Sequence, residues 1–523
     1  MHRSAPSAPP ARAGRREWIG LAVLTLPTLL VSVDVFVMLL ALPHLSSDLG
    51  AGSTEQLWIM DTYAFLLAGF LITMGTVGDL IGRRRLLLLG GAGFGLASVL
   101  CAYSVNPEML ILARGLLGVA GATLAPSTLA LISNMFADPR QRGLAISVWL
   151  AAFMGGAATG PVIGGLLLEN YWWGSVFLLG VPVMVLLLGL GPVLLPEYRD
   201  TTGRRLDLIS VAQSLAAILP VIYGLKELAR NGWHPAPILA VLAGLAFVVL
   251  FVRRQHRLAD PLLDLRLFAD RAFSAALGSM LFGTMLMGAI MLLITQYLQL
   301  VAQLSPLRAG LWMLPSAGAA TASFLGATLL VRRFRPAYLI GAGLAAAVLG
   351  LLLITQVRTT AGLGLLTTGF VFINLGSGPL LTLGTDLIVG SVSPAKAGSA
   401  AAMNETSGEF GFALGIAVLG SIATAAYRHE LRDTLPPGLS PQATQRARDS
   451  LANASTAIVP DRLRPELLAA AQHAFIDGMR IVAGASALVL AGVAVLTVRL
   501  LRHVPATAAG NDLPEPSTAA PAG

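Results

Sequence analysis

The chain has 523 residues, of which 55% are hydrophobic and only 12% are charged. Because a soluble globular protein carries about 25% charged residues, this composition excludes an ordinary soluble domain and indicates a polytopic membrane protein. The net charge of +8 comes from basic residues scattered over many short segments, so we expect no nucleic-acid partner. The single cysteine, Cys101, rules out an intramolecular disulfide framework.

Apolar stretches of about 18–28 residues, each long enough to cross a lipid bilayer, recur along the chain. We predict an all-α membrane protein with fourteen transmembrane helices, at residues 18–43, 56–78, 86–105, 108–132, 142–168, 174–195, 207–228, 236–252, 272–299, 307–330, 337–356, 362–386, 397–426 and 475–498.

The distribution of basic residues predicts the orientation of these helices. With the N-terminus inside, the inner segments and the two tails carry 23 of the 35 Lys and Arg residues, whereas the short outer loops carry four. Basic residues favour the cytoplasmic side, and two cytoplasmic termini require an even number of crossings. We therefore predict a multi-pass protein of the cell membrane with both termini in the cytoplasm.

Two segments of the chain resemble each other. Residues 75–93 and 326–343 each contain a Gly, an Arg cluster and the start of a new apolar helix, in that order. Their offset of 251 residues exceeds the roughly 180 residues of the first six spans, which indicates two six-helix bundles separated by two inserted central helices. Such halves are typical of secondary transporters, which rock about a site near the bilayer midplane.

The predicted organisation is a cytoplasmic N-terminal tail (1–17), an N-terminal six-helix bundle (18–196), a two-helix insert (197–260), a C-terminal six-helix bundle (261–504) with a long outer segment at 428–474, and a disordered cytoplasmic tail (505–523).

Four carboxylates interrupt the predicted spans: Asp34, Asp61, Glu405 and Glu409. A charge at the bilayer centre costs at least ~2.5–3.5 kcal/mol on insertion scales, so such residues indicate an ion or proton pathway. Glu405 and Glu409 are four residues apart and share one helix face. Two such carboxylates resist simultaneous ionisation and would hold one proton between them.

Several motifs resemble those of the major facilitator superfamily and, within it, the fourteen-helix drug:proton antiporters, in particular the quaternary-ammonium exporters. They are the loop motif Gly-Thr-Val-Gly-Asp-Leu-Ile-Gly-Arg-Arg-Arg at 75–85, the buried-arginine motif Leu-Ile-Leu-Ala-Arg-Gly-Leu-Leu-Gly at 110–118, the antiporter motif Gly-Gly-Ala-Ala-Thr-Gly-Pro-Val-Ile-Gly-Gly at 155–165, Asp34 followed by Ala-Leu-Pro at 41–43, Trp-Ile-Met-Asp-Thr-Tyr at 58–63, and Glu405 with Glu409. The resemblance covers essentially residues 18–500, and it implies the major facilitator fold.

Asp34, Arg114 and Glu405 form the predicted proton-coupling site. A carboxylate beside an arginine within the membrane can gain or lose a proton as its surroundings change. The alternative for Asp34 and Arg114 is a static ion pair that holds two helices together. The alternative for Glu405 is a polar cavity lining without selectivity.

The predicted cargo site contains Asp61, Trp58, Phe65, Glu409 and Trp312. Asp61 shares a helix face with Trp58 and Phe65, and a carboxylate beside aromatic rings attracts a desolvated organic cation. Trp58 would otherwise be an interfacial anchor. The flexible side chains of Met280, Met285, Met287, Met291 and Met313 could adapt to irregular ligands, although plain packing is the alternative.

The predicted gating residues fall into two groups. Gly75, Asp79, Gly82 and Arg83 belong to an inner loop that must rearrange when the halves rock, although arginines there would also serve topology alone. Gly160, Pro161 and Gly164 allow a bend and close packing, and we expect them to hinge and seal the cytoplasmic half without touching cargo.

These features predict a proton-coupled antiporter that exports lipophilic, cationic drugs and dyes by alternating access. No phosphate-binding loop of the Gly-x-x-x-x-Gly-Lys-Ser/Thr type occurs, which argues against ATP as the energy source. The expected partners are small lipophilic cations, protons and the bilayer, with no cofactor, no metal and no enzymatic reaction, and a monomer is expected to function. The alternatives are a dedicated exporter of one endogenous metabolite or antibiotic and, against the antiporter motif, an uptake symporter.

Overall fold

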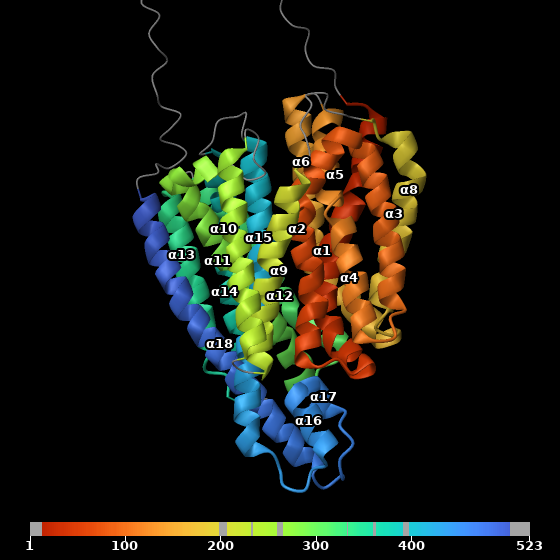
Figure 1. Ribbon diagram of the computed structural model, residues 1–523. Helices are drawn as coiled ribbons and strands as arrows, with labels where there is room; N and C mark the ends of the chain where they lie inside the picture. Colours follow the sequence, from red (N-terminus) through yellow and green to blue (C-terminus); the bar gives the residue numbers. More distant parts are fainter. Residues whose placement is uncertain are drawn as a thin grey trace, which may run out of the picture.

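The computed structural model describes residues 13–136, 138–197, 207–231, 234–258, 265–331, 333–358, 362–390 and 397–502. Every regular element among these residues is a helix (Figure 1), as the sequence predicts. In chain order the elements are α1 (Arg15–Leu49), α2 (Ser53–Ile81), α3 (Arg83–Ala102), α4 (Pro107–Gly121), α5 (Leu124–Met135), α6 (Pro139–Asn170), α7 (Ser175–Leu178), α8 (Gly180–Leu194), α9 (Leu208–Asn231), α10 (Pro235–Arg257), the 3₁₀-helix η1 (Leu265–Ala269), α11 (Arg271–Gln296), the π-helical turn η2 (Tyr297–Val301), α12 (Pro306–Leu330), α13 (Pro336–Ile354), α14 (Leu363–Gly390), α15 (Ala397–Thr434), α16 (Pro441–Asp449), α17 (Leu451–Ser455) and α18 (Arg464–Leu501).

Eleven helices of the described residues are long and apolar enough to cross a membrane. Each of the fourteen predicted spans falls on an observed helix or helix pair, but those on α2, α9 and α12 are outside these eleven. The number of crossings therefore stays a prediction.

The predicted span 108–132 is interrupted in the structure. It forms two helices, α4 and α5, which are separated by Ala122 and Thr123. The reason is Pro126, which has no N–H to donate to the carbonyl of Ala122 and so breaks the helix one turn earlier. A single residue joins α2 to α3: Gly82 has φ 109°, a conformation that residues with a side chain rarely adopt.

The long helices form two groups, with α1–α8 at the right of Figure 1 and the later helices at the left. The groups meet where α2 packs on α15 and where α6 packs on α12. The start of α1 and the end of α18 lie at the same end of the molecule. This arrangement agrees with two bundles, while the predicted domain boundaries stay a prediction.

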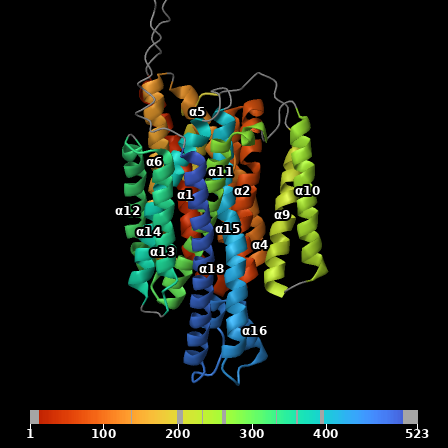
Figure 2. The ribbon, with the colours of Figure 1, turned by 90° about the vertical axis from the view of Figure 1, so that its left-hand side faces the viewer.

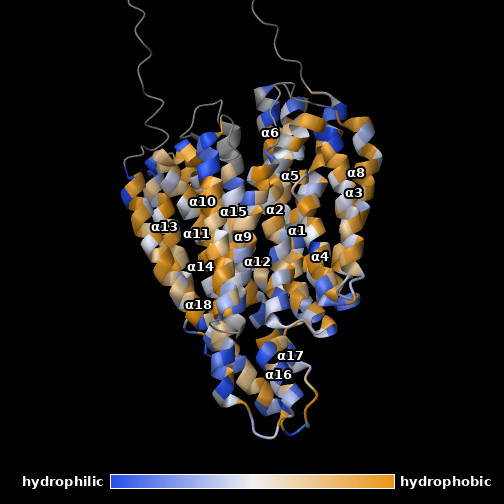
Figure 3. Cartoon of the chain, in the orientation of Figure 1, coloured by the Kyte–Doolittle hydropathy of each residue, from blue (hydrophilic) through white to orange (hydrophobic). Residues whose placement is uncertain are grey.

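The inserted pair α9–α10 lies at one edge of the molecule (Figure 2). α10 packs mainly on α9, and α9 in turn packs on α15 and α2. The outward side chains of α10, among them Leu239, Leu242 and Leu245, are exposed. Figure 3 shows apolar residues along most of the length of the long helices and polar ones gathered at their ends. An exposed apolar surface of this extent suits contact with lipid.

The predicted outer segment 428–474 is largely helical. α15 continues to Thr434 and α18 begins at Arg464, so both helices extend into it. Between them lies a small cap, residues 441–455, which consists of α16 and α17 at the lower end of Figure 1. The Tyr427 hydroxyl donates to the carbonyl of Ala447 at 2.7 Å. The Asn453 side chain donates to the carbonyl of Ala51 at 3.2 Å, so the cap contacts both helix groups.

Candidate functional site

The core of the candidate site is an ion pair between α1 and α4. Arg114 Nη1 lies 2.9 Å from Asp34 Oδ2, and the two side chains are 1% and 10% exposed. Arg114 Nε also donates to the carbonyl of Ile59 at 3.1 Å, and the guanidinium lies 4.3 Å from the ring centroid of Tyr63. One side chain thus links α4 to both α1 and α2. The pair that the sequence predicts does form.

Small residues on α4 allow this approach. A Cβ at Gly118 would collide with the carbonyl of Tyr63, so only glycine lets α4 pack this closely on α2. The close contact brings the Arg114 guanidinium over the Tyr63 ring. Tyr63 itself is fully buried, and its hydroxyl has no hydrogen-bond partner among the described residues. Tyr63 ends the motif at 58–63, but the sequence analysis does not predict it as a site residue.

The predicted cargo residues on α2 lie toward α15. Asp61 is 0% exposed, and the ring of Phe65, one turn away, lies 5.8 Å from that of Phe410 in an edge-on contact. Leu57, one turn before Asp61, faces Gly420 of α15. Asp61 therefore lies on the helix face that meets the second group of helices. Trp58 is only partly buried and packs against the hydrophobic core.

Two carboxylates of α15 lie across the boundary between the helix groups. Together with charged residues of α1, α2 and α4 they form a set that we call the charge cluster: Asp34, Asp61, Arg114, Glu405 and Glu409. Glu405 and Glu409 are both partly buried, and they lie within electrostatic range of each other. Tyr63 lies within electrostatic range of Asp34, Arg114 and Glu409. Acidic groups from both helix groups thus lie near enough to act electrostatically on one tyrosine.

A small cavity of about 60 Å³ lies between the two groups, with walls from α1, α6, α11, α12 and α14. Met287, Met291 and Met313 line it, together with Phe36 and Phe370. Pro161 also lines this cavity, although we expected it to lie away from cargo. Trp312 does not line it; its side chain is 40% exposed on the surface of α12. The other predicted cargo residues do not line this cavity either; they belong to α2 and α15: Trp58, Asp61, Phe65 and Glu409.

The antiporter motif packs α6 against its neighbours. Gly160 faces Phe36 and Gly164 faces Val37, both on α1, while the carbonyl of Pro161 contacts Gly310 of α12. These residues lie in the second half of α6. If the termini are cytoplasmic, as predicted, that half is the outer one, which does not fit the expected role in sealing the cytoplasmic half. The role of these residues in gating stays a prediction.

The arginines at the start of α3 contact the end of α8 and the residues that follow it. Arg84 Nη1 donates to the carbonyls of Pro192 and Leu195 at 3.2 and 3.0 Å, and Arg84 and Arg85 lie 3.5 and 3.8 Å from Glu197. The sequence offered no signal for Glu197, because it follows an apolar span like many solvated acids. Gly75 lies on α2 with open space beside it. The side chain of Asp79 lies outside the described part of the structure.

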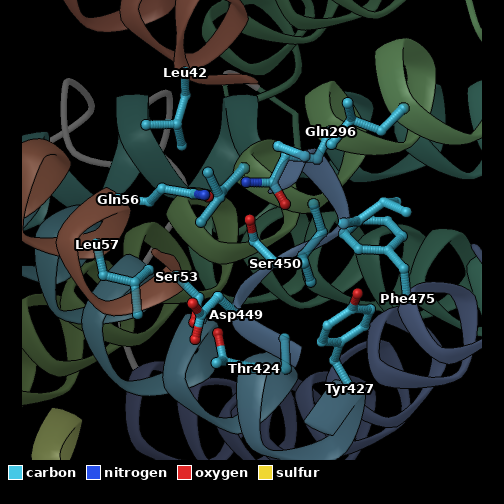
Figure 4. A pocket seen from close by; sticks show the side chains of 17 residues that line it. Leu42, Ser53, Gln56, Leu57, Gln296, Thr424, Tyr427, Asp449, Ser450 and Phe475 are labelled. Atoms are coloured by element: carbon cyan, nitrogen blue, oxygen red, sulfur yellow. The ribbon is translucent and has the colours of Figure 1, made fainter. Parts of the chain in front are cut away.

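Another small cavity, of about 50 Å³, lies beneath the cap (Figure 4). Its lining is more polar than that of the first: Gln56, Gln296, Asp449 and Ser450 contribute to it. Nearby, the Gln299 side chain donates to the carbonyl of Leu40 at 2.9 Å and ties η2 to α1. The two groups of helices are thus joined at the end that carries the cap.

Comparison with known proteins decides the family. The family model of the Major Facilitator Superfamily matches residues 24–416. The chain belongs to the major facilitator superfamily. Among its relatives within this superfamily, it is 42% identical to the multidrug efflux pump LfrA of Mycolicibacterium smegmatis over 94% of this chain and 98% of that protein. It is 34% identical to the methyl viologen resistance protein SmvA of Salmonella typhimurium over 88% of this chain and 93% of that protein.

The superfamily assignment agrees with the fold. A bacterial homologue of the human lysosomal transporter Spinster, solved in an inward-facing and unoccupied conformation, superposes with a TM-score of 0.66 at 15% identity. The alignment covers 94% of this chain and 98% of that one. The chain is therefore a multi-pass membrane transporter of the major facilitator superfamily, related to drug efflux pumps.

Proposed function

We propose that this transporter is a proton-coupled antiporter that exports lipophilic organic cations from the cytoplasm. The observation that carries the proposal is the Asp34–Arg114 pair, at 2.9 Å and nearly buried. A carboxylate inside membrane-spanning helices is costly and is retained where an ion or proton must pass. The pair lies beside the boundary along which the two helix groups would rock.

Proton exchange and cargo binding would compete for the same carboxylates. In the cytoplasm-facing state a carboxylate would release its proton and bind the cation, and protonation from outside would then eject the cation. A membrane potential supplies ~2.3 kcal/mol per charge per 100 mV. Each pH unit adds ~1.4 kcal/mol per proton, so one or two protons sustain gradients of roughly a hundredfold or more.

The choice of cargo rests on charge and polarizability. Asp61, Glu405 and Glu409 supply negative charge beside the Phe65 ring, and the methionines of the cavity between the groups adapt to different shapes. Efflux relatives support export, and the name of one refers to methyl viologen, an organic dication. The proposal includes fourteen crossings, cytoplasmic termini and function as a monomer.

Proton release tests the proposal. We would reconstitute the full chain in vesicles with an acidic lumen and a luminal pH dye, and then add ethidium outside. Antiport predicts that ethidium entry drives protons out and raises the luminal pH, in proportion to the ethidium taken up. Ethidium movement without a pH change would contradict proton coupling, and co-movement of protons with ethidium would indicate a symporter. Repeating the assay with unrelated dyes separates a multidrug pump from an exporter of one compound.

A further inference from the structure

A large cavity that none of the proposed steps uses lies beside the contact between α2 and α15. Its volume is about 470 Å³. Its walls come from α2, α11 and α15, and the inserted helices line its outer side with Ser214 and Ile218 of α9 and Phe251 of α10. The insert therefore forms the wall between this lateral cavity and the edge of the molecule seen in Figure 2.

The depth of the lateral cavity follows from its lining residues. Thr73 belongs to the second half of α2, and Ser274 and Gly278 lie in the first turns of α11. These positions are nearest to the end of the molecule where α1 starts. Under the proposed orientation the cavity lies at the level of the cytoplasmic leaflet.

The opposite contact between the two helix groups, where α6 packs on α12, borders only the smaller cavity that Pro161 and Met313 line. There the backbones of α6 and α12 touch, because Gly310 lies against the carbonyl of Pro161. On the cavity side, α9 covers the junction of α2 and α15 instead, with Leu215 over Gly69. The outer face of the insert is apolar and exposed, so only one helix pair separates the cavity from lipid.

The chemistry of the lining favours a compound with an apolar body and a polar group. Aromatic rings of Phe251, Phe268 and Phe410 line the cavity, and so does Thr406. The Thr406 hydroxyl is buried and has no hydrogen-bond partner among the described residues. An unsatisfied buried hydroxyl costs about 1–3 kcal/mol, and a lipid acyl chain could not relieve this cost.

A ring pair separates the lateral cavity from the charge cluster. Phe410 lines the cavity and contacts Phe65, whose helix carries Asp61 one turn away. The preceding residue, Glu409, is absent from the lining, because α15 presents its other face there. A compound that passed between the two rings would leave the cavity and meet the carboxylates.

We propose that the lateral cavity is a binding site through which small lipophilic cations enter from the cytoplasmic leaflet, with the α9–α10 insert as its outer wall. This inference rests on the proposed export function and names the route by which cargo reaches the carboxylates. It assigns the insert a role that the two bundles alone do not require.

Filling the cavity tests the inference. An added Cβ at Gly278 meets no described atom within 4 Å, so Gly278→Trp projects into the cavity without a backbone collision. Gly492 on α18 is equally open but lies away from the cavity, and Gly492→Trp is the matched control. Ser214→Trp fills the cavity from the insert side, with Leu245→Trp on the lipid face of α10 as its control. If Gly278→Trp fails to fold, Ser214→Trp and its control Leu245→Trp still test the inference.

Two readouts are needed. In energised cells with equal amounts of each protein, we expect both cavity variants to lower ethidium efflux at sub-saturating dye about tenfold, equivalent to about 1.4 kcal/mol of binding. Both controls should retain the wild-type rate. In the purified full chain, photoreactive ethidium monoazide should label peptides of α9, α11 or α15, and the cavity variants should lose this label.

The outcomes separate the inference from the proposed function. If wild type pumps ethidium and the cavity variants pump equally well, the inference is overturned while the export function stands. If wild type does not pump, the export function fails, and labelling still decides whether the cavity binds the cation. Labelling confined to other helices, or a co-purified phospholipid that ethidium does not displace from the cavity, also overturns the inference.

Discussion

Arg114 is the residue on which most of the charge cluster depends. Its guanidinium contacts Asp34 of α1, the carbonyl of Ile59 and the ring of Tyr63 on α2. Lysine could not satisfy the carboxylate and the carbonyl at once, because it lacks the planar fork of donors. Arg114 therefore fixes the relative position of three helices as well as the carboxylate.

We expect Arg114→Met to destabilise the folded transporter by about 3–5 kcal/mol, because it leaves a carboxylate buried without its partner. Thermal unfolding of the purified protein measures the effect. The double variant Asp34→Leu/Arg114→Met, which removes both charges, should recover most of the loss. If the double variant is no more stable than the single one, the pair is not the cause.

The residues of the cluster could be predicted only in part. Asp34 and Arg114 could be predicted as site residues because a charged residue within an apolar stretch is unusual on any side of the helix. Tyr63 and Thr406 could not, since their importance comes from a hydroxyl left without a partner after packing. Trp312 is exposed on the surface of α12, a position that the sequence does not reveal, and its role in cargo binding stays a prediction.

At the scale of helices, the close contact of α6 with α12 depends on Gly310. Its Cβ position is occupied by the carbonyl of Pro161, whereas a Cβ at Gly318 of the same helix would meet no described atom within 4 Å. We expect Gly310→Val to force the helices apart and to cost about 1–3 kcal/mol of stability. Gly318→Val is the control, and equal melting temperatures for the two variants would contradict this contact.

An ion pair joins the start of α9 to the end of α10. Arg254 donates to both carboxylate oxygens of Asp207, at 2.7 and 3.0 Å, and Asp207 directly precedes α9. The hydrogen bond from Arg254 lowers the pKa of Asp207 from 3.8 to about 2, against a smaller opposing effect of burial and with further help from Ser210. Nothing in the sequence pattern indicates this pair.

The lowered pKa predicts how the pair responds to pH. Its contribution to stability is complete above the ordinary pKa of 3.8 and is lost as the pH falls through about 2. The pair is therefore intact between about pH 5 and 8, where transport is measured. We expect Asp207→Asn to lower the melting temperature by a few degrees and to leave the pH profile of transport unchanged in that range. A shifted profile would show that this pair takes part in coupling.

Helices were easier to predict than their ends and interruptions. Long apolar runs identify the positions of α1, α3 or α13 directly, because nothing else can cross a bilayer alone. The break between α4 and α5 depends on one proline, and the cap depends on contacts such as that of Tyr427 with Ala447. Short polar helices of this kind have no periodic apolar signal of their own.

At the scale of the molecule, the two helix groups are held together unequally. They are tied near the cap by Gln299 and Asn453, and along one side by α6 and α12. On the other side the insert spans the junction above the lateral cavity. The arrangement suits rocking that opens one end while the other stays closed, with the carboxylates of Asp34 and Glu409 near the boundary.

The most direct test of the account is ethidium efflux from energised cells that carry Asp34→Asn, compared with wild type at equal protein levels. The amide keeps the size and hydrogen-bonding capacity of the side chain but cannot exchange a proton. We predict that uphill efflux is lost, while the purified variant still binds ethidium. Efflux against a gradient at the wild-type rate would contradict the claim that Asp34 couples protons to export.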